Sequence, residues 1–221
     1  MNEVERRYTR QIVELRADSE SRQIGGYAAK FGRLSEDLGG FREQIDPSFF
    51  NKSKGDGWPG VVARYQHDDN YLLGTSGAGT LRLSVDSTGL AYDVDVPHAR
   101  EDVFELVQRG DVRASSFAFV AFEDDFERNN EGVLIRTLYT GKLFDVAPVV
   151  TPAYPDATVG LRSLARQFDA EFEEVRALAR ANELDRLFVR TDRPSVPPTD
   201  TRSTKSITEL RRELLAKNAS F

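Results

Sequence analysis

Residues 114–150 contain two long apolar runs, ASSFAFVAF (114–122) and VLIRTLYTGKLFDVAPVV (133–150). Branched and aromatic residues dominate both runs, and such residues favour extended strands. We therefore expect one strand at 114–122 and one or two strands at 133–150, with Gly141 as the break in the second case. This pair predicts a fold built on sheets.

Shorter strands are expected upstream of this pair. Apolar and polar residues alternate at 61–67, which predicts a half-buried strand. Two further runs, 80–85 and 90–96, are separated by the turn-prone residues 86–89 and predict a hairpin. The remaining strands are expected at 8–15, 23–31 and 38–45.

One helix is expected inside this β-rich body, at residues 97–109. Val103, Leu106 and Val107 are spaced to share one helix face, and Gly110 follows where a C-cap belongs. Several short strands at this spacing, with one interior helix, are typical of a barrel or a sandwich.

Composition and charge divide the chain into four parts. Residues 1–160 form the β-rich body. Residues 161–190 place apolar side chains three or four apart, which predicts an amphipathic helix that packs on the body or on a second copy of the chain. Residues 191–205 are rich in Pro, Ser and Thr and predict a linker. Residues 206–221 begin with a capping box and predict a short basic helix, too short to be stable alone.

The composition excludes several functional classes. The chain has 221 residues, a net charge of −6, two His and no Cys. The lack of cysteine excludes disulfides, thiol nucleophiles and zinc–thiolate sites. No apolar run approaches the ~18 residues of a membrane-spanning helix. An acidic chain is also a poor partner for nucleic acid in general, so we expect neither nucleic-acid nor membrane binding.

Five residues are candidates for acid–base or nucleophilic chemistry. His67 ends a predicted strand, and His98 begins the predicted helix. Ser115 and Ser116 open an apolar strand, and a serine acts as a nucleophile only with a base beside it. Asp145 interrupts an apolar strand, where a buried carboxylate would need a donor such as an imidazole N–H. Each residue, taken alone, is more often structural than functional.

The order of these motifs resembles the tailed-phage prohead serine proteases, which are related in fold to the herpesvirus capsid assembly proteases. The resemblance covers roughly residues 22–161. It is carried by IGGYAAKF (24–31), GGFRE (39–43), YQHD (65–68), GL (89–90), RGDV (109–112), SFAF (116–119) and DVAPVVTPAY (145–154).

The resemblance implies a mainly β fold with peripheral helices (α+β), an antiparallel β-barrel of the herpesvirus-protease type followed by C-terminal helices. His67 matches the general base. Ser116, directly before Phe-x-Phe, matches the nucleophile, whereas Ser115 falls on a position that is usually small or apolar. Asp145 matches the third member of the triad at a position where the family more often has Glu. His98 precedes the nucleophile in the chain and so does not fit the second His of the herpesvirus enzymes.

The implied function is that of a serine endopeptidase without metal or cofactor. It would cut scaffold segments of the major capsid protein, and itself, inside the immature prohead in the host cytoplasm. Self-cleavage within or near 191–205 would remove the tail. The alternative is that the tail is an unselected, flexible C-terminus. The alternative function is a non-catalytic scaffold or capsid-binding module. The distance between Ser116 Oγ and a His67 ring nitrogen separates the two functions.

Overall fold

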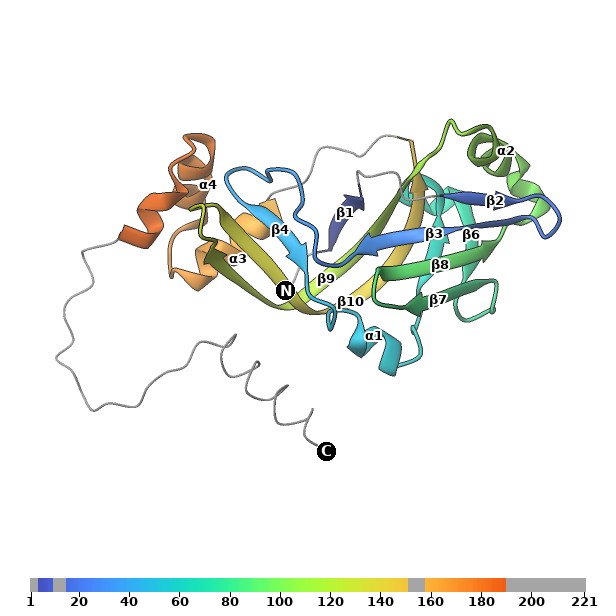
Figure 1. Cartoon of the computed structure of the whole chain (residues 1–221), viewed down its shortest axis with the longest axis horizontal. Coiled ribbons are helices and arrows are strands. Elements are labelled where there is room, and N and C mark those ends of the chain that lie inside the picture. Colours follow the sequence, from blue (N-terminus) through green and yellow to red (C-terminus); the bar gives the residue numbers. More distant parts are fainter. Residues whose placement is uncertain (1–3, 10–14, 151–157, 190–221) are drawn as a thin grey trace. The chain divides into compact units, whose positions relative to one another are not determined.

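A computed structural model describes residues 4–9, 15–150 and 158–189 (Figure 1). The strands are β1 (Glu5–Thr9), β2 (Arg16–Asp18), β3 (Gln23–Lys30), β4 (Arg42–Ile45), β5 (Val62–Arg64), β6 (Leu72–Thr75), β7 (Leu81–Val85), β8 (Gly89–Asp95), β9 (Ala114–Arg128) and β10 (Leu134–Val149). The helices are α1 (Asn51–Gly55), α2 (Glu101–Arg109), α3 (Thr158–Gln167) and α4 (Phe172–Arg180). Short 3₁₀ turns are η1 (Tyr65–His67), η2 (Asp69–Tyr71), η3 (His98–Arg100) and η4 (Leu184–Val189).

The strands form two sheets. The six-stranded sheet has the order β1-β9-β10-β5-β6, with β4 also paired to β10, and the four-stranded sheet has the order β2-β3-β8-β7. Most pairs are antiparallel, whereas β10 runs parallel to β4 and to β5. The mainly β fold with a few helices is therefore confirmed. The closed barrel is not, because the strand pairs of the described residues leave both sheets open.

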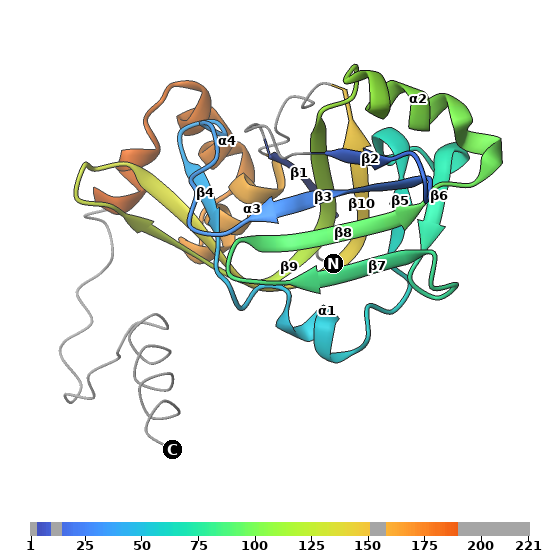
Figure 2. The ribbon, with the colours of Figure 1, turned by 45° about the vertical axis from the view of Figure 1, so that its right-hand side comes forward.

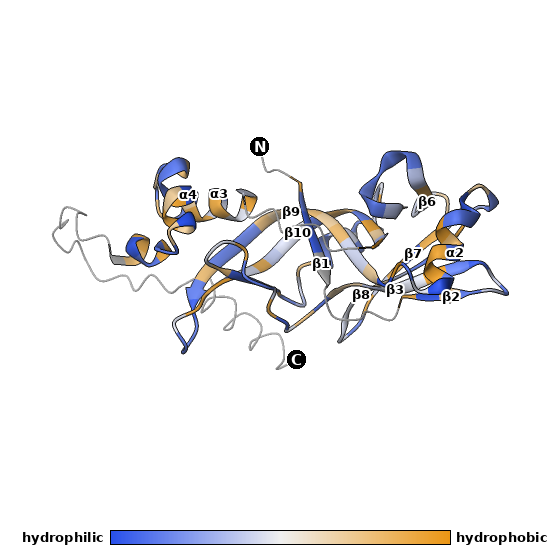
Figure 3. Ribbon diagram, turned by 90° about the horizontal axis from the view of Figure 1, so that it is seen from above, coloured by the Kyte–Doolittle hydropathy of each residue, from blue (hydrophilic) through white to orange (hydrophobic). Residues whose placement is uncertain are grey.

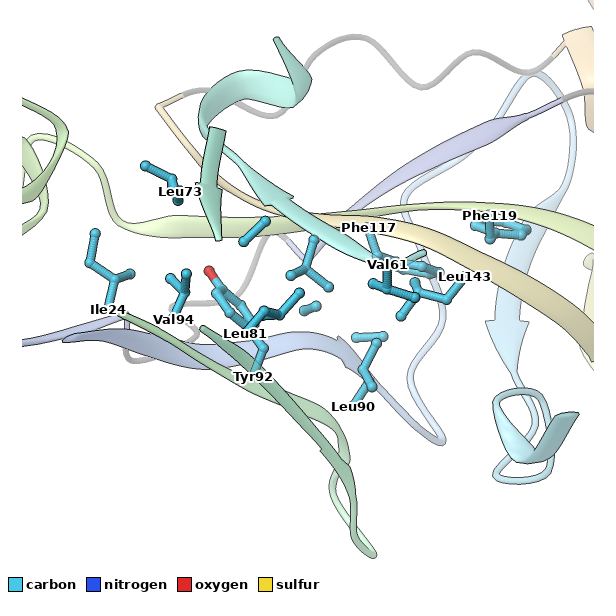
Figure 4. Packing of buried hydrophobic residues seen from close by; sticks show 14 of the residues in the cluster. Ile24, Val61, Leu73, Leu81, Leu90, Tyr92, Val94, Phe117, Phe119 and Leu143 are labelled. Carbon is cyan, nitrogen blue, oxygen red and sulfur yellow. The ribbon is translucent and has the colours of Figure 1, made fainter. Parts of the chain in front are cut away.

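The larger of two hydrophobic clusters lies between the sheets (Figure 4). Tyr92 and Val94 of β8 and Phe117 and Phe119 of β9 all belong to this cluster and are almost completely buried. Side chains alternate between the two faces of a strand. Because Phe117 and Phe119 point into this cluster, Ser116 lies on the opposite face of the six-stranded sheet.

The second hydrophobic cluster joins α3, α4 and η4 to one end of the β9–β10 hairpin. Both helices carry hydrophobic residues between hydrophilic ones, as the orange and blue stretches in Figure 3 show. The single helix expected at 161–190 is therefore wrong. Asp169 and Asn182, whose φ angles are 48° and 57°, interrupt it and divide it into α3, α4 and η4. A uniform apolar stripe does not reveal such left-handed breaks.

Other expectations can be compared with the structure directly. The β7–β8 hairpin is confirmed, and α2 ends at Gly110, whose φ of 81° is that of a left-handed C-cap. The strand expected at 61–67 ends three residues early, at Arg64. The strand expected at 8–15 is described only as far as Thr9, and residues 151–155 and 190–221 lie outside the described residues.

Strand β10 continues through Gly141 instead of dividing there. The register between β9 and β10 shifts on both sides of Gly141, which accommodates the irregularity without ending the strand. A Cβ at this position would overlap Cζ of Phe49, so glycine allows that ring to pack against the strand. Among the described residues, no helix has the length and apolar character needed to span a membrane.

Candidate active site

Three neighbouring elements of the six-stranded sheet bring the predicted residues together. Ser116 lies on β9, Asp145 on β10, and His67 in turn η1 directly after β5. Strand β10 lies between β9 and β5, as Figure 2 also shows, and pairs Ala147 with Ser116 and Asp145 with Val62. This order of elements places His67 within reach of both Asp145 on β10 and Ser116 on β9.

The two ring nitrogens of His67 have different partners. Nε2 lies 2.6 Å from Ser116 Oγ, and Nδ1 lies 2.5 Å from Oδ1 of Asp145. A carboxylate only accepts hydrogen bonds, so it selects the tautomer of His67 that carries its proton on Nδ1. Nε2 is then an acceptor for the hydroxyl proton of Ser116. This arrangement can move a proton from the serine to the imidazole.

An irregular backbone puts the His67 ring in this position. Gln66 and His67 have φ angles of 56° and 58°, a left-handed conformation that few residues other than glycine adopt. Such conformations cost about 1–3 kcal/mol each and occur often at functional sites. The turn removes His67 from the alternation of β5 and directs its ring toward β9 and β10.

Arg64 is the member of this site that the sequence did not indicate. Its Nη2 donates to Oδ2 of Asp145, and its Nη1 donates to Oδ1 of Asp69. Burial acts to lower the pKa of Arg64, but the hydrogen bonds and charges of Asp145 and Asp69 together outweigh it and raise that pKa. Arg64 therefore gives the fully buried Asp145 an ionic partner on the side away from His67. In the sequence, Arg64 looks like any outward-facing residue of an alternating strand.

Ser115 and His98, the other two candidate residues, lie outside the arrangement of Ser116, His67 and Asp145. Ser115 faces the core, with its Oγ 3.0 Å from the hydroxyl of Tyr92, which points toward β9 in Figure 4. Burial raises the pKa of Tyr92 far above its ordinary value, so this hydroxyl stays neutral and is not a base for Ser115. His98 lies in the exposed turn η3 before α2.

A main-chain carbonyl also contacts the candidate nucleophile. Ser116 Oγ lies 2.8 Å from the carbonyl oxygen of Arg7, on the neighbouring strand β1. Ser116 itself has no exposed surface. As for metals, the described ranges hold no group of three or more His, Asp or Glu residues arranged to bind an ion.

A comparison with known protein families matches residues 8–171 to the caudovirus prohead serine proteases. The match includes His67, Ser116 and Asp145 and extends over most of the chain. No curated protein and no solved structure gives a significant match. The resemblance seen in the motifs is thus confirmed by a model of the whole family. The chain belongs to the caudovirus prohead serine protease family and is a serine endopeptidase.

Proposed function

We propose that this capsid maturation protease cuts the scaffold segment of the major capsid protein, with Ser116 as nucleophile, His67 as general base and Asp145 as the residue that orients His67. The observation that carries the proposal is the pair of contacts made by the His67 ring, 2.6 Å to Ser116 Oγ and 2.5 Å to Asp145 Oδ1. A non-catalytic scaffold or capsid-binding module would leave this buried arrangement without a role.

The reaction begins when Nε2 of His67 takes the hydroxyl proton of Ser116. The Oγ atom forms a bond to the carbonyl carbon of the scissile peptide, and the imidazolium then donates its proton to the leaving nitrogen as the C–N bond breaks. The product is an acyl-enzyme ester on Ser116. His67 next takes a proton from water, the resulting hydroxide attacks the ester, and Ser116 recovers its proton. Asp145 stabilises the imidazolium in both halves of the reaction.

The proposed substrates also include the chain itself. Residues 191–205 are rich in Pro, Ser and Thr, a composition typical of a linker. Proteases cut exposed linkers because an extended segment fits a cleft. A cut there would release the short basic tail, 206–221. Both reactions would take place inside the immature prohead, where protease and capsid protein are enclosed together.

The proposal is tested by expressing the chain together with its major capsid protein and weighing all products by intact mass spectrometry. The wild-type chain is expected to shorten the capsid protein and to lose its own C-terminal segment. Ser116→Ala is expected to abolish both cuts, whereas the matched variant Ser115→Ala keeps them. Cleavage by Ser116→Ala at the wild-type rate would overturn the assignment of the nucleophile. Removal of the scaffold with the tail intact would overturn only the self-cleavage.

A further inference from the structure

Strand β1 lies beside the proposed nucleophile in the way that a bound peptide would. It pairs antiparallel with β9, and the register sets Tyr8 opposite Ser116. Extended peptides commonly bind by adding a strand to a sheet edge. The carbonyl oxygen of Arg7 accepts a hydrogen bond from Ser116 Oγ at 2.8 Å. The carbonyl group of Arg7 thus lies beside the attacking atom, although it is hydrogen-bonded through its oxygen and not aligned for attack on its carbon.

This contact leaves no access to Ser116. The residue is fully buried, and its single hydroxyl proton has two acceptors within reach, Nε2 of His67 and the carbonyl oxygen of Arg7. A hydroxyl donates to only one acceptor at a time, so the Arg7 carbonyl competes with the base. A substrate carbonyl therefore cannot reach Oγ until β1 leaves.

The side chain of Arg7 fills a buried acidic site next to this carbonyl. Its Nε and Nη2 donate to the two carboxylate oxygens of Glu43, at 2.6 and 3.0 Å, and its guanidinium lies 5.6 Å from the centre of the Phe119 ring. Nη2 also donates to Glu5, on the same strand as Arg7. A bidentate pair of this kind selects the planar guanidinium strongly.

The charges that remain when β1 leaves favour a basic replacement. Glu5 and Arg7 would depart together, and Glu43, Asp124 and Arg136 would stay. Arg136 contacts both carboxylates, Glu43 at 2.9 Å and Asp124 at 2.5 Å, but brings one positive charge against two negative ones. Glu43 would keep its hydrogen bond from Arg136 but lose both hydrogen bonds from Arg7, and a guanidinium on the substrate would restore them.

We infer that β1 occupies the substrate position of this protease, that it must be displaced before cleavage, and that the residue on the N-terminal side of the scissile bond is basic and binds Glu43 as Arg7 does. The inference rests on the proposed function, because it requires Ser116 as the nucleophile. It adds the class of substrate and a step that controls access to the site.

The first test uses the unaltered full-length chain. Three peptidyl diphenyl phosphonates, which react covalently with active serines, carry the sequence of residues 4–6 followed by an Arg, Gln or Glu analogue at the phosphonate. The Arg probe is expected to react at least about tenfold faster than the Gln probe, and the Glu probe slowest, because a site built for a hydrogen-bonding group rejects analogues that lack it. Equal rates for the three probes would overturn the acidic subsite.

The second measurement follows β1 in the same samples. Hydrogen exchange of the amides of residues 5–9 is compared between the free chain and the Arg-probe adduct. Displacement predicts that these amides lose protection in the adduct, because a released strand exchanges like an unfolded segment. An adduct in which β1 stays as protected as in the free chain would overturn the displacement.

A matched pair of variants gives an independent check. Arg7→Ala removes the hydrogen bonds from Arg7 to Glu43 and so weakens the hold on β1, which keeps its pairing with β9 and the contacts between Glu5 and Arg136. Arg6→Ala changes an exposed arginine on the same strand. Arg7→Ala is expected to react with the phosphonates about tenfold faster or more, since the competent fraction of molecules rises. Arg6→Ala should match the wild type. Equal rates for both variants would contradict the inference. Failure of every variant to react, with exchange showing a released β1 in Arg7→Ala, would instead refute the proposed nucleophile.

Discussion

Replacing Asp145 by Asn tests how the proposed triad sets the tautomer of His67. The change keeps the shape of the side chain but removes its charge and turns one oxygen into an NH₂ group. Arg64 donates to Oδ2 of Asp145 and has no acceptor to offer, so the amide introduced by Asp145→Asn must direct its oxygen toward Arg64. The NH₂ group then faces Nδ1 of His67, which has to become an acceptor. Nε2 consequently carries the proton and cannot accept the one from Ser116.

We expect a large loss of activity in Asp145→Asn, because Arg64 fixes the orientation of the amide and thereby forces His67 into the wrong tautomer. The same substitution in a well-studied serine protease lowers kcat about 10⁴-fold. At 1.36 kcal/mol for each factor of ten, this corresponds to about 5 kcal/mol of transition-state stabilisation. The effect on stability should be smaller, because Arg64 keeps a second partner, Asp69, at the surface.

The assay is the second-order rate of reaction with a fluorophosphonate, together with thermal unfolding of each variant. Asp69→Asn is the matched control, since it changes the other partner of Arg64, and its rate should stay within about threefold of the wild type because exposed pairs contribute little. The double variant Arg64→Ala with Asp145→Asn should react faster than Asp145→Asn alone, because its amide is free to turn. A folded Asp145→Asn chain that reacts within tenfold of the wild type would refute the tautomer argument.

Three further predictions concern the base, the buried ion network and strand β10. His67→Ala should lower the rate of reaction with the fluorophosphonate by about 10⁶, the loss that removal of the catalytic histidine causes in a well-studied serine protease. His98→Ala should leave the rate unchanged. Equal losses in the two variants would point to a second catalytic histidine. Arg136→Ala should lower the free energy of unfolding in urea by about 3–5 kcal/mol, because Glu5, Glu43 and Asp124 lose their shared partner. Arg82→Ala breaks an exposed pair with Asp95 and should cost less than about 1 kcal/mol; similar losses for both would contradict the account. Gly141→Ala should cost about 1–3 kcal/mol in the same assay by pressing on Phe49, whereas Gly77→Ala, which meets open space, should cost little; a neutral Gly141→Ala would disprove the close packing.

The strands and the motif residues of this protein can be predicted from the sequence because both are local features. The alternation in the β7–β8 hairpin and the apolar runs of β9 and β10 follow from the residues themselves. The roles expected for His67, Ser116 and Asp145 come from the resemblance of the motifs around them to those of the prohead serine proteases. The alternation of side chains along β9 also explains why the two serines differ: Ser115 faces the core with Phe117, whereas Ser116 faces the opposite side of the sheet.

The remaining features depend on contacts between distant segments or on single backbone angles. Arg64 is 81 residues from Asp145, and Arg7 is 109 residues from Ser116, so neither contact leaves a local signal. The left-handed angles of Gln66, Asp169 and Asn182 occur at residues other than glycine. Asp and Asn adopt such angles more often than other non-glycine residues, but most of them do not, so the residue type alone does not locate these breaks. For this reason the strand expected at 61–67 and the helix expected at 161–190 are both longer than the elements in the structure.

The most direct test of the account is to identify the residue that a fluorophosphonate modifies. The wild-type chain, Ser116→Ala and Ser115→Ala are incubated with the probe, digested and mapped by tandem mass spectrometry. The account predicts one adduct, on Ser116, in the wild type and in Ser115→Ala, and none in Ser116→Ala. An adduct on Ser115, or labelling that persists in Ser116→Ala, would contradict it.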